Sequence, residues 1–253
     1  MRSPGERLRA EREGVNAVGR GGAAVLGAFL MSGLLGLGFL LGEAAVRVKE
    51  YERTVVVKGL SEREYPADVV IWPIRFSVAG NALAALYDTL DKDTERVLGF
   101  LKRQGISDEE ITVAPPVVTD QWAGRHAVGQ RPEFRYAAVQ TVTVYSHRVA
   151  AVRKLMGRLS ALGRQGIALT GGRYGDDVEY LFTRLNQVKP GMIEEATRKA
   201  REVAEKFAAD SHSRLGKIKH ARQGRFSITS RDRNNPHIKR VRVVSTIEYY
   251  LAD

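Results

Sequence analysis

The chain has 253 residues, of which 43% are apolar and 27% are charged, and its net charge is +11. This length and apolar content suffice for one sizeable globular domain with an appendage, and they exclude a wholly disordered chain. The absence of cysteine excludes disulfides, thiolate metal sites and a cysteine nucleophile, but it does not identify the compartment.

The first predicted element is an uncharged segment of 22 residues, 21–42. As a helix it would be about 33 Å long, close to the roughly 30 Å hydrocarbon core of a bilayer. We predict a transmembrane helix at 21–42 after a basic cytoplasmic leader at 1–20. Five preceding arginines favour a cytoplasmic N-terminus: Arg2, Arg7, Arg9, Arg12 and Arg20. A signal peptide cleaved near Gly42-Glu43-Ala44 is the alternative, and either interpretation exports the remainder.

Small residues recur along this predicted transmembrane helix. Ala24, Ala28, Ser32 and Gly36 are spaced by four, and Gly38 and Gly42 form a GxxxG pattern. Such stripes permit close contact between membrane helices, so we predict helix association through the first four. The alternative is that alanine and glycine are simply common in membrane helices.

A polar linker at 43–53 leads to one predicted domain at 54–253 that alternates between strand and helix patterns. A turn is expected from Gly59 to Pro66, a sheet edge or bulge at Pro73, and a polar loop at 224–237. Runs of β-branched and aromatic residues predict strands at 54–57, 69–78, 111–118, 134–145, 167–170, 178–183, 217–222 and 241–251.

Apolar residues at helical spacing predict three helices in this domain. The first opens at Gly80-Asn81 and stops at Gly105, and the second is capped by Ser146 and ends at Gly163 or Gly166. The third has Pro190 in its first turn. Its predicted buried stripe is Ile193, Ala196, Ala200, Val203, Ala204 and Phe207.

The succession β-α-β-β-α-β from Val69 to Thr170 is the split motif of ferredoxin-like sandwiches. It predicts helices on one face of a sheet in which sequential strands are mostly antiparallel. We therefore predict the α+β class: a two-layer sandwich with helices packed on a largely antiparallel sheet, preceded by one N-terminal transmembrane helix.

Four segments in order resemble the SIMPL-domain family over roughly residues 54–251. They are VVVKGLSEREYPADVVIWPIRFSV, LKRQGISDEEITVAPPVV, FRYAAVQTVTVYSHRVAAVRKLM and EEATRKAREVAEKFAADSHSRLGKIKHARQG. Members are typically exported proteins of bacterial envelopes, also called periplasmic immunogenic or oxidative-stress defence proteins. The resemblance implies an exported envelope protein with a part in envelope or oxidative stress tolerance. Together with the apolar segment and its basic leader, it predicts a single-pass protein of the bacterial inner membrane with its C-terminal domain in the periplasm. The family has no agreed catalytic motif, so it supplies no functional residues.

The chain contains neither G-x-S-x-G nor H-E-x-x-H, and its histidines are scattered: His126, His147, His212, His220 and His237. Asp176-Asp177 is interpreted as part of a turn, and Trp72 and Trp122 are expected in a core or interface. We predict no catalytic, cofactor-binding or metal-binding residues. The alternative is a periplasmic hydrolase, whose signature would be a pocket that joins His126, His147 or His220 to a carboxylate.

Basic residues gather between His212 and Arg242, where Asp232 is the single acid. The ten cations are Arg214, Lys217, Lys219, Arg222, Arg225, Arg231, Arg233, Lys239, Arg240 and Arg242. They favour an anionic partner, such as lipid headgroups or another envelope component, but a solvated sheet edge explains them equally well. Nucleic acid is disfavoured because the domain is exported and no stacking motif accompanies the charges. We predict a non-catalytic interaction or assembly module, with homo-oligomers expected.

Overall fold

The computed structural model describes residues 22–44, 53–123, 132–171 and 178–252. The chain divides into two compact units. The first unit comprises Met1–Gly59, Lys199–Arg222 and Thr246–Asp253, and the second comprises Leu60–Arg198 and Gln223–Ser245. Two antiparallel sheets and their helices give the predicted α+β class.

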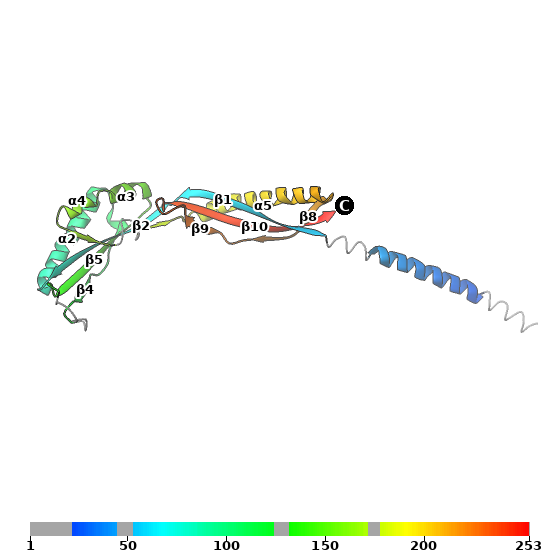
Figure 1. Ribbon diagram of the computed structural model, residues 1–253, viewed down its shortest axis with the longest axis horizontal. Helices are drawn as coiled ribbons and strands as arrows, with labels where there is room; N and C mark the ends of the chain where they lie inside the picture. Colours follow the sequence, from blue (N-terminus) through cyan, green and yellow to red (C-terminus); the bar gives the residue numbers. More distant parts are fainter. Residues whose placement is uncertain (1–21, 45–52, 124–131, 172–177, 253) are drawn as a thin grey trace, which may run out of the picture. The chain divides into compact units, whose positions relative to one another are not determined.

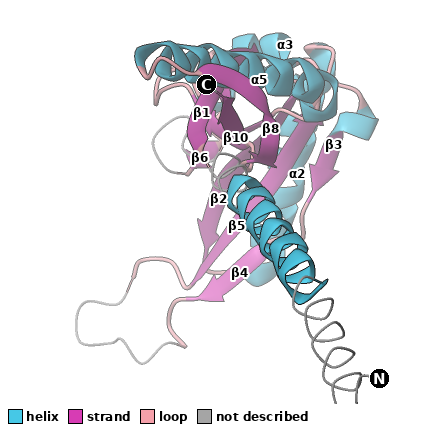
Figure 2. Ribbon diagram, turned by 90° about the vertical axis from the view of Figure 1, so that its right-hand side faces the viewer, coloured by secondary structure: helices cyan, strands magenta, loops and turns pink. Residues whose placement is uncertain are grey.

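The second unit contains a six-stranded sheet with the order β3-β5-β2-β6, in which β4 also pairs with β5 and β7 with β2. The two long strands β2 and β5 pair along their whole length in the centre of this sheet (Figure 2). Strands joined through a helix are not neighbours, since β5 lies between β2 and β3, and this confirms the split motif. The bounds are β2 Val69–Gly80, β3 Ile111–Val113, β4 Val117–Asp120, β5 Tyr136–Ser146, β6 Ala168–Thr170 and β7 Glu179–Leu181.

Three helices pack their apolar faces on this sheet: α2 (Leu83–Arg103), α3 (Val149–Met156) and α4 (Ser160–Gly163). Alternate side chains of β2 enter the core that they share, and Phe76 is fully buried. Gly105, the predicted stop, lies just beyond the end of α2 and has a φ of +83°. Only glycine adopts this left-handed conformation without strain, and this explains why the helix stops there. The sheet and helices therefore form one layered core.

Pro73 lies in a central strand, so its predicted place at an edge or bulge is wrong. It pairs with Thr143 of β5 on one side of β2. On the other side β7 pairs with Val69–Ile71 and β6 with Arg75–Ser77, so no described strand pairs with residues 72–74 there. The missing N–H of proline is tolerated because that side of the ladder is interrupted at this point.

The second sheet has the order β1-β10-β8, with β9 also paired to β10. The turn predicted from Gly59 to Pro66 is wrong, because β1 runs without a break over Thr54–Pro66 and only Ala67 and Asp68 separate it from β2. Gly59 and Ser61 are buried, and the Ser61 hydroxyl donates to Glu195 of α5 over 3.0 Å. The glycine therefore sits on the packed face of a strand rather than in a turn.

The remaining strands are β8 Arg214–Gln223, β9 Ser227–Ser230 and β10 Ile238–Ala252. The polar loop predicted at 224–237 therefore contains a strand, since β9 pairs antiparallel with β10 and places Ile228 opposite Val241. Gly224 lies so close to β10 that its N–H donates to the Val244 carbonyl over 2.8 Å. Because backbone atoms make these contacts, the sequence shows no alternation of apolar side chains from which a strand could be predicted here.

Helix α5 spans Leu185–Asp210 and differs from its prediction in two respects (Figure 1). Pro190 lies inside the helix rather than in its first turn, because the helix begins at Leu185. Val203 and Phe207 are 38% and 56% exposed and do not belong to the buried stripe. Residues at every fourth position form that stripe instead, and all but the first are alanine: Met192, Ala196, Ala200, Ala204 and Ala208.

Each unit buries its own part of α5. In the second unit Met192 and Ala196 pack with Phe182, Val241 and Val243. In the first unit the cluster consists of Val57, Ala200, Ala204, Ile247 and Tyr249. Alanine on the buried face lets the helix approach the sheet closely, and this explains why the larger Val203 and Phe207 face outward.

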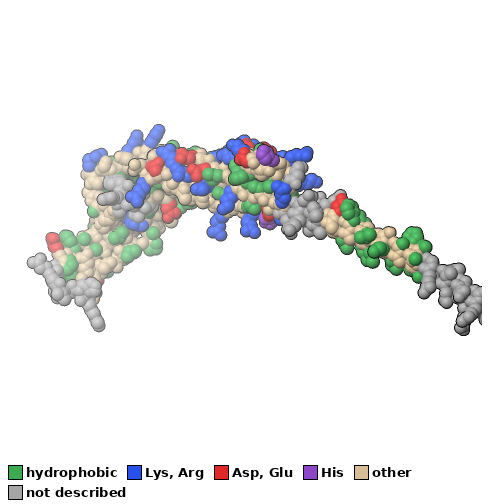
Figure 3. Space-filling model, turned by 45° about the vertical axis from the view of Figure 1, so that its right-hand side comes forward, with side chains coloured by type: hydrophobic (Ala, Val, Ile, Leu, Met, Phe, Trp, Pro, Cys, Tyr) green, Lys and Arg blue, Asp and Glu red, His purple; other side chains and the backbone are tan. Residues whose placement is uncertain are grey.

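A separate helix spans Gly22–Ala44, one residue later at its start and two residues later at its end than predicted. It has 23 residues and a mean hydropathy of 2.2, and none of its most apolar window is buried. Hydrophobic side chains gather along its visible face (Figure 3). By length and composition it could cross a membrane, and a signal sequence would share these properties.

Candidate functional site

The ten predicted cations of the basic stretch lie on both units. Arg214, Lys217, Lys219 and Arg222 belong to β8 in the first unit. The other six lie in the second unit, on β10, in the turn before it or between β8 and β9. They are Arg225, Arg231, Arg233, Lys239, Arg240 and Arg242. The structure therefore does not gather all ten within one unit.

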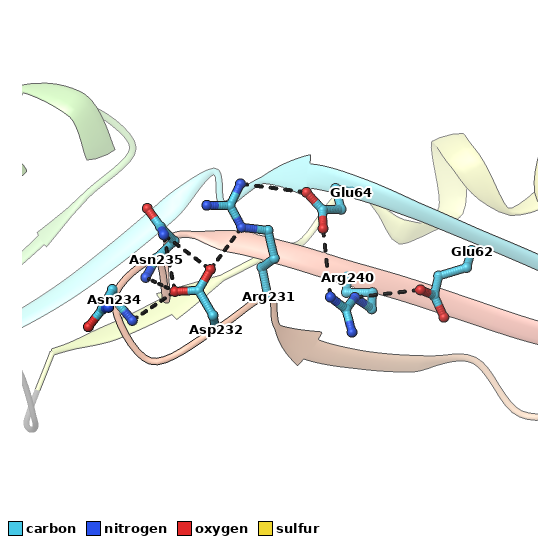
Figure 4. A network of polar contacts seen from close by, with 7 residues as sticks. All are labelled: Glu62, Glu64, Arg231, Asp232, Asn234, Asn235 and Arg240. Carbon is cyan, nitrogen blue, oxygen red and sulfur yellow. Dashed lines mark hydrogen bonds and ion pairs between the residues drawn. The ribbon is translucent and has the colours of Figure 1, made fainter.

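Acidic residues of β1 neutralise part of the basic stretch in the second unit (Figure 4). The Arg231 guanidinium lies 3.7 Å from the Glu64 carboxylate and donates to Asp232 over 2.9 Å. Arg240 lies 3.6 Å from Glu62 and 3.8 Å from Glu64. These side chains are roughly a third to a half exposed, so each pair contributes little stability, but together they fix the charges along β1 and β10.

Asp232 organises the turn between β9 and β10. Its carboxylate accepts hydrogen bonds from the backbone N–H groups of Asn234 and Asn235, both over 2.8 Å. The Arg231 hydrogen bond, followed by those from Asn235 and Asn234, lowers the pKa of Asp232 to about 2. The single acid of the basic stretch is therefore a structural turn residue.

Other predicted cations have weaker partners or none. Lys219 lies 3.2 Å from Glu248, and Lys239 donates to the Ser230 hydroxyl over 3.0 Å. Among the described residues, six exposed cations form no ion pair: Arg214, Lys217, Arg222, Arg225, Arg233 and Arg242. These six are the part of the basic stretch that an anionic partner could contact.

The predicted membrane contact residues lie on the isolated helix Gly22–Ala44. Ala24, Ala28, Ser32 and Gly36 are all exposed, and the glycine has no heavy atom within 4 Å of an added Cβ. Their spacing of four residues keeps them near one side of the helix. The stripe is thus free to receive another helix, and association through it stays a prediction.

A family comparison assigns the folded part of the chain. The SIMPL family model, described as a protein of unknown function (DUF541), matches residues 55–244. The chain belongs to the SIMPL family. No curated protein matches the sequence. The matched residues run from β1 into β10, so this SIMPL domain includes residues of both units.

The SIMPL domain has a cleft of about 480 Å³ in its second unit. One wall consists of Pro66 at the end of β1, Ala67, which follows it, and His237, which precedes β10. The other wall is the start of α3, with His147, Arg148, Val149, Ala150, Ala151 and Arg153. Sequence analysis did not find this cleft, because its two histidines are 90 positions apart and have no spacing motif.

Hydrogen bonds hold the α3 wall in place. Helix α3 begins at Val149, later than predicted, and Ser146 precedes it with its hydroxyl accepting the Arg148 N–H over 3.0 Å. Arg148 donates to the Gly105 carbonyl over 2.7 Å and to the Glu110 carboxylate. Partial burial raises the pKa of Glu110, but hydrogen bonds from Arg148, Ser146 and Ser107 outweigh it and lower that pKa to about 2.

The other residues considered for chemistry lie apart from the cleft. Trp72 is 4% exposed and lies in the core, as predicted. Trp122 is 45% exposed, and the Arg135 guanidinium carbon lies 5.8 Å from the centroid of its ring. His126 and Asp176-Asp177 lie outside the described residues. Within the part of the chain that the structure describes, no three His, Asp or Glu residues gather as a metal site would require.

Proposed function

We propose that this protein is a single-pass inner-membrane protein whose SIMPL domain acts in the periplasm as a non-catalytic interaction and assembly module. The helix Gly22–Ala44 carries the proposal, because all of its apolar side chains are exposed. Leaving such a surface in water is strongly unfavourable, whereas a bilayer removes the cost. Residues 45–53 provide a short link to the start of β1.

The orientation follows from charge. Five arginines precede the apolar helix, and cytoplasmic flanks of membrane helices carry such an excess. A cleaved signal peptide is less consistent with the sequence, because its apolar region would have about 7–15 residues. The periplasmic setting also motivates the association with envelope or oxidative stress tolerance that the SIMPL resemblance implies.

Assembly with a second copy is supported by an exposed apolar pair on α5. Val203 and Phe207 are one turn apart and lie in the first unit. Exposed aromatic side chains are enriched in protein interfaces. A membrane anchor confines copies to one plane and raises their effective concentration, so a modest patch suffices for association. The small-residue stripe of the membrane helix would add a second contact.

A hydrolase is the rival function, and the cleft is its best location. Its described lining includes His147 and His237 but no carboxylate. The His147 Nδ1 lies 3.2 Å from the Asp68 backbone carbonyl rather than from an acid. A histidine general base is usually oriented by a carboxylate, so this lining favours the non-catalytic proposal.

The anchor is tested with reporter fusions to the full chain. Alkaline phosphatase fused after Asp253 should be active. A reporter that works only in the cytoplasm should be inactive when it is fused at the same position. The protein should stay in the membrane after alkaline carbonate extraction with residues 1–20 intact by mass spectrometry. An inactive phosphatase fusion would contradict export, and loss of the N-terminal segment would contradict the anchor.

Assembly is tested with Phe207→Lys in the full chain. Cross-linking in membranes and light scattering in detergent should give oligomers for the wild type and a loss of them for the variant. Tyr87→Lys is the matched control, since Tyr87 is 40% exposed on α2 in the second unit. A monomeric wild type, or equal losses in both variants, would contradict assembly through α5.

A further inference from the structure

The cleft of the second unit is lined by basic side chains and by small or aliphatic ones. Its nine lining residues include two arginines and two histidines but no acid. Five others are small or aliphatic: Pro66, Ala67, Val149, Ala150 and Ala151. A volume of about 480 Å³ is within the range of small-molecule sites. The lining thus suits a compact anion with an organic body.

Arg153 supplies the charge that points to a ligand. Arg148, the other lining arginine, is occupied by Glu110 and the Gly105 carbonyl. Arg153 lies near the Tyr180 phenol, where its charge offsets part of the rise in the pKa of Tyr180 that burial causes, and no described carboxylate forms an ion pair with Arg153. A guanidinium without a carboxylate partner among the described residues retains donors for a planar or tetrahedral oxyanion.

His237 lines the same cleft as Arg153, close enough for the Arg153 charge to lower the pKa of the imidazole. Its Nδ1 is buried and has no hydrogen-bond partner among the described residues. Its backbone carbonyl accepts the Ala67 N–H over 2.8 Å, and its ring lies 6.1 Å from the Tyr180 ring. An unsatisfied buried ring nitrogen is unusual and costs stability, so packing alone does not account for the position of this imidazole at the edge of the cleft. The first turn of α3 adds backbone N–H groups to the same cleft.

We propose that this cleft binds a small organic phosphate, with its phosphoryl oxygens held by Arg153, His237 and the first turn of α3. Two features favour phosphate over a carboxylate. A phosphate presents three oxygens, which can meet donors from both walls at once, and its charge approaches two at neutral pH. The small side chains beside these donors leave room for a sugar or glycerol group. This site is independent of membrane anchoring and of assembly.

Charged groups from several segments of the chain act on the pKa of His237. Arg153 of α3 and Arg231 before β10 disfavour its protonated form, while Asp232 favours it. The Tyr180 ring of β7 also contacts the His237 ring, and His147 and Arg148, just before α3, line the cleft. A bound phosphate would add negative charge among these groups. Binding should therefore strengthen as His237 becomes protonated.

Calorimetric titration of the full chain in a maltoside detergent, with glucose 6-phosphate, inorganic phosphate and succinate as probes, tests the proposal. We expect both phosphates to bind and succinate to bind at least about tenfold more weakly. Arg153→Gln and His237→Asn should each weaken phosphate binding by about tenfold or more. The matched control is Arg164→Gln, which removes the same charge from an exposed position at the end of α4.

Thermal unfolding of each variant separates loss of binding from loss of folding. Equal weakening by Arg164→Gln, equal binding of succinate, or a wild type that binds no phosphate would overturn the proposal. Nanodiscs distinguish the source of the phosphate group. If phosphatidylglycerol nanodiscs block soluble phosphate in the wild type and uncharged-lipid nanodiscs do not, the ligand is a lipid headgroup, and otherwise it is a soluble organic phosphate.

Discussion

The Arg148 guanidinium at the start of α3 donates to the Glu110 carboxylate, which belongs to the one-turn helix Asp108–Glu110 before β3. The two residues are 38 positions apart, and their ion pair joins the end of the α2 region to the wall of the cleft. The Ser146 hydroxyl donates to the same carboxylate over 2.5 Å, and Ser107 completes a capping box with it. Glu110 is thus a junction between three segments of the chain.

Glu110→Gln should lower the free energy of unfolding at neutral pH by about 1–2 kcal/mol. The folded pKa of about 2 lies below the ordinary glutamate value of 4.5, so the unfolded chain binds the proton more tightly. The stabilisation is present above the unfolded pKa and is lost as pH falls from about 4.5 toward 2. Urea unfolding at several pH values measures it.

The matched control for Glu110 is Asp108→Asn, because the Asp108 side chain is 76% exposed. That variant should change stability little at any pH. If Glu110→Gln shows the same acid dependence as the wild type, the carboxylate does not stabilise the junction.

Gly224→Ala should destabilise the second unit. A Cβ at this position would lie 2.6 Å from the Val244 carbonyl oxygen, and that atom belongs to the backbone of β10. The strands must separate or bend to relieve the contact, which costs about 1–3 kcal/mol. The midpoint of urea unfolding should fall accordingly.

Gly163→Ala is the comparison, since a Cβ there has no heavy atom within 4 Å and the residue lies in α4. Alanine should be neutral or stabilise the helix by up to about 1 kcal/mol. A similar midpoint for both alanine variants would show that Gly224, just after β8, is not in close contact with β10.

Local patterns in the sequence were sufficient for the split motif and for most strands. Alternation in β2 and β5 and the glycine stop at Gly105 depend on neighbours in the chain, and sequence analysis identified them. The predictions were wrong where tertiary packing decides the conformation. Gly59 reads as a turn residue, yet it is buried within a strand, and Val203 and Phe207 fit the helical period but lie outside an alanine stripe.

The cleft could not be predicted for a similar reason. His147 and His237 belong to segments that only the tertiary fold brings to the same cleft, and neither has a motif nearby. The basic stretch was visible in the sequence because its charges cluster between His212 and Arg242 with a single acid among them. Its partial neutralisation by Glu62 and Glu64 was not visible, since pairing depends on β1 lying beside β10.

Asp68→Ala should destabilise the connection between β7 and α5. The Asp68 carboxylate accepts the Thr183 N–H over 2.9 Å, the Thr183 hydroxyl over 3.1 Å and the Arg184 Nε–H over 3.0 Å. Burial raises the pKa of Asp68, but these bonds outweigh it and keep the pKa below its usual value. Loss of the acceptor leaves donors unpaired at the start of the helix and should cost about 1–3 kcal/mol. Hydrogen exchange at Thr183 should accelerate, and unchanged exchange would contradict this role.

His237 should make the protein less stable in mild acid. Burial, followed by the charges of Arg153 and Arg231, lowers the pKa of His237 below the ordinary histidine value of 6.5, although Asp232 opposes them. The unfolded chain therefore takes up this proton more readily, so stability is lost as pH falls through 6.5 toward the folded pKa.

His237→Gln removes this titration while keeping a polar side chain. The difference in free energy of unfolding between wild type and variant should shift in favour of the variant on going from neutral to mildly acidic pH, as measured by urea unfolding. Tyr180 beside His237 and the lining residues His147 and Arg148 are the same in both proteins, so the comparison isolates the change at position 237. Added glucose 6-phosphate should reduce the acid loss of the wild type alone, because a bound anion favours the protonated imidazole. A pH-independent difference would show that His237 titrates alike in the folded and unfolded chains.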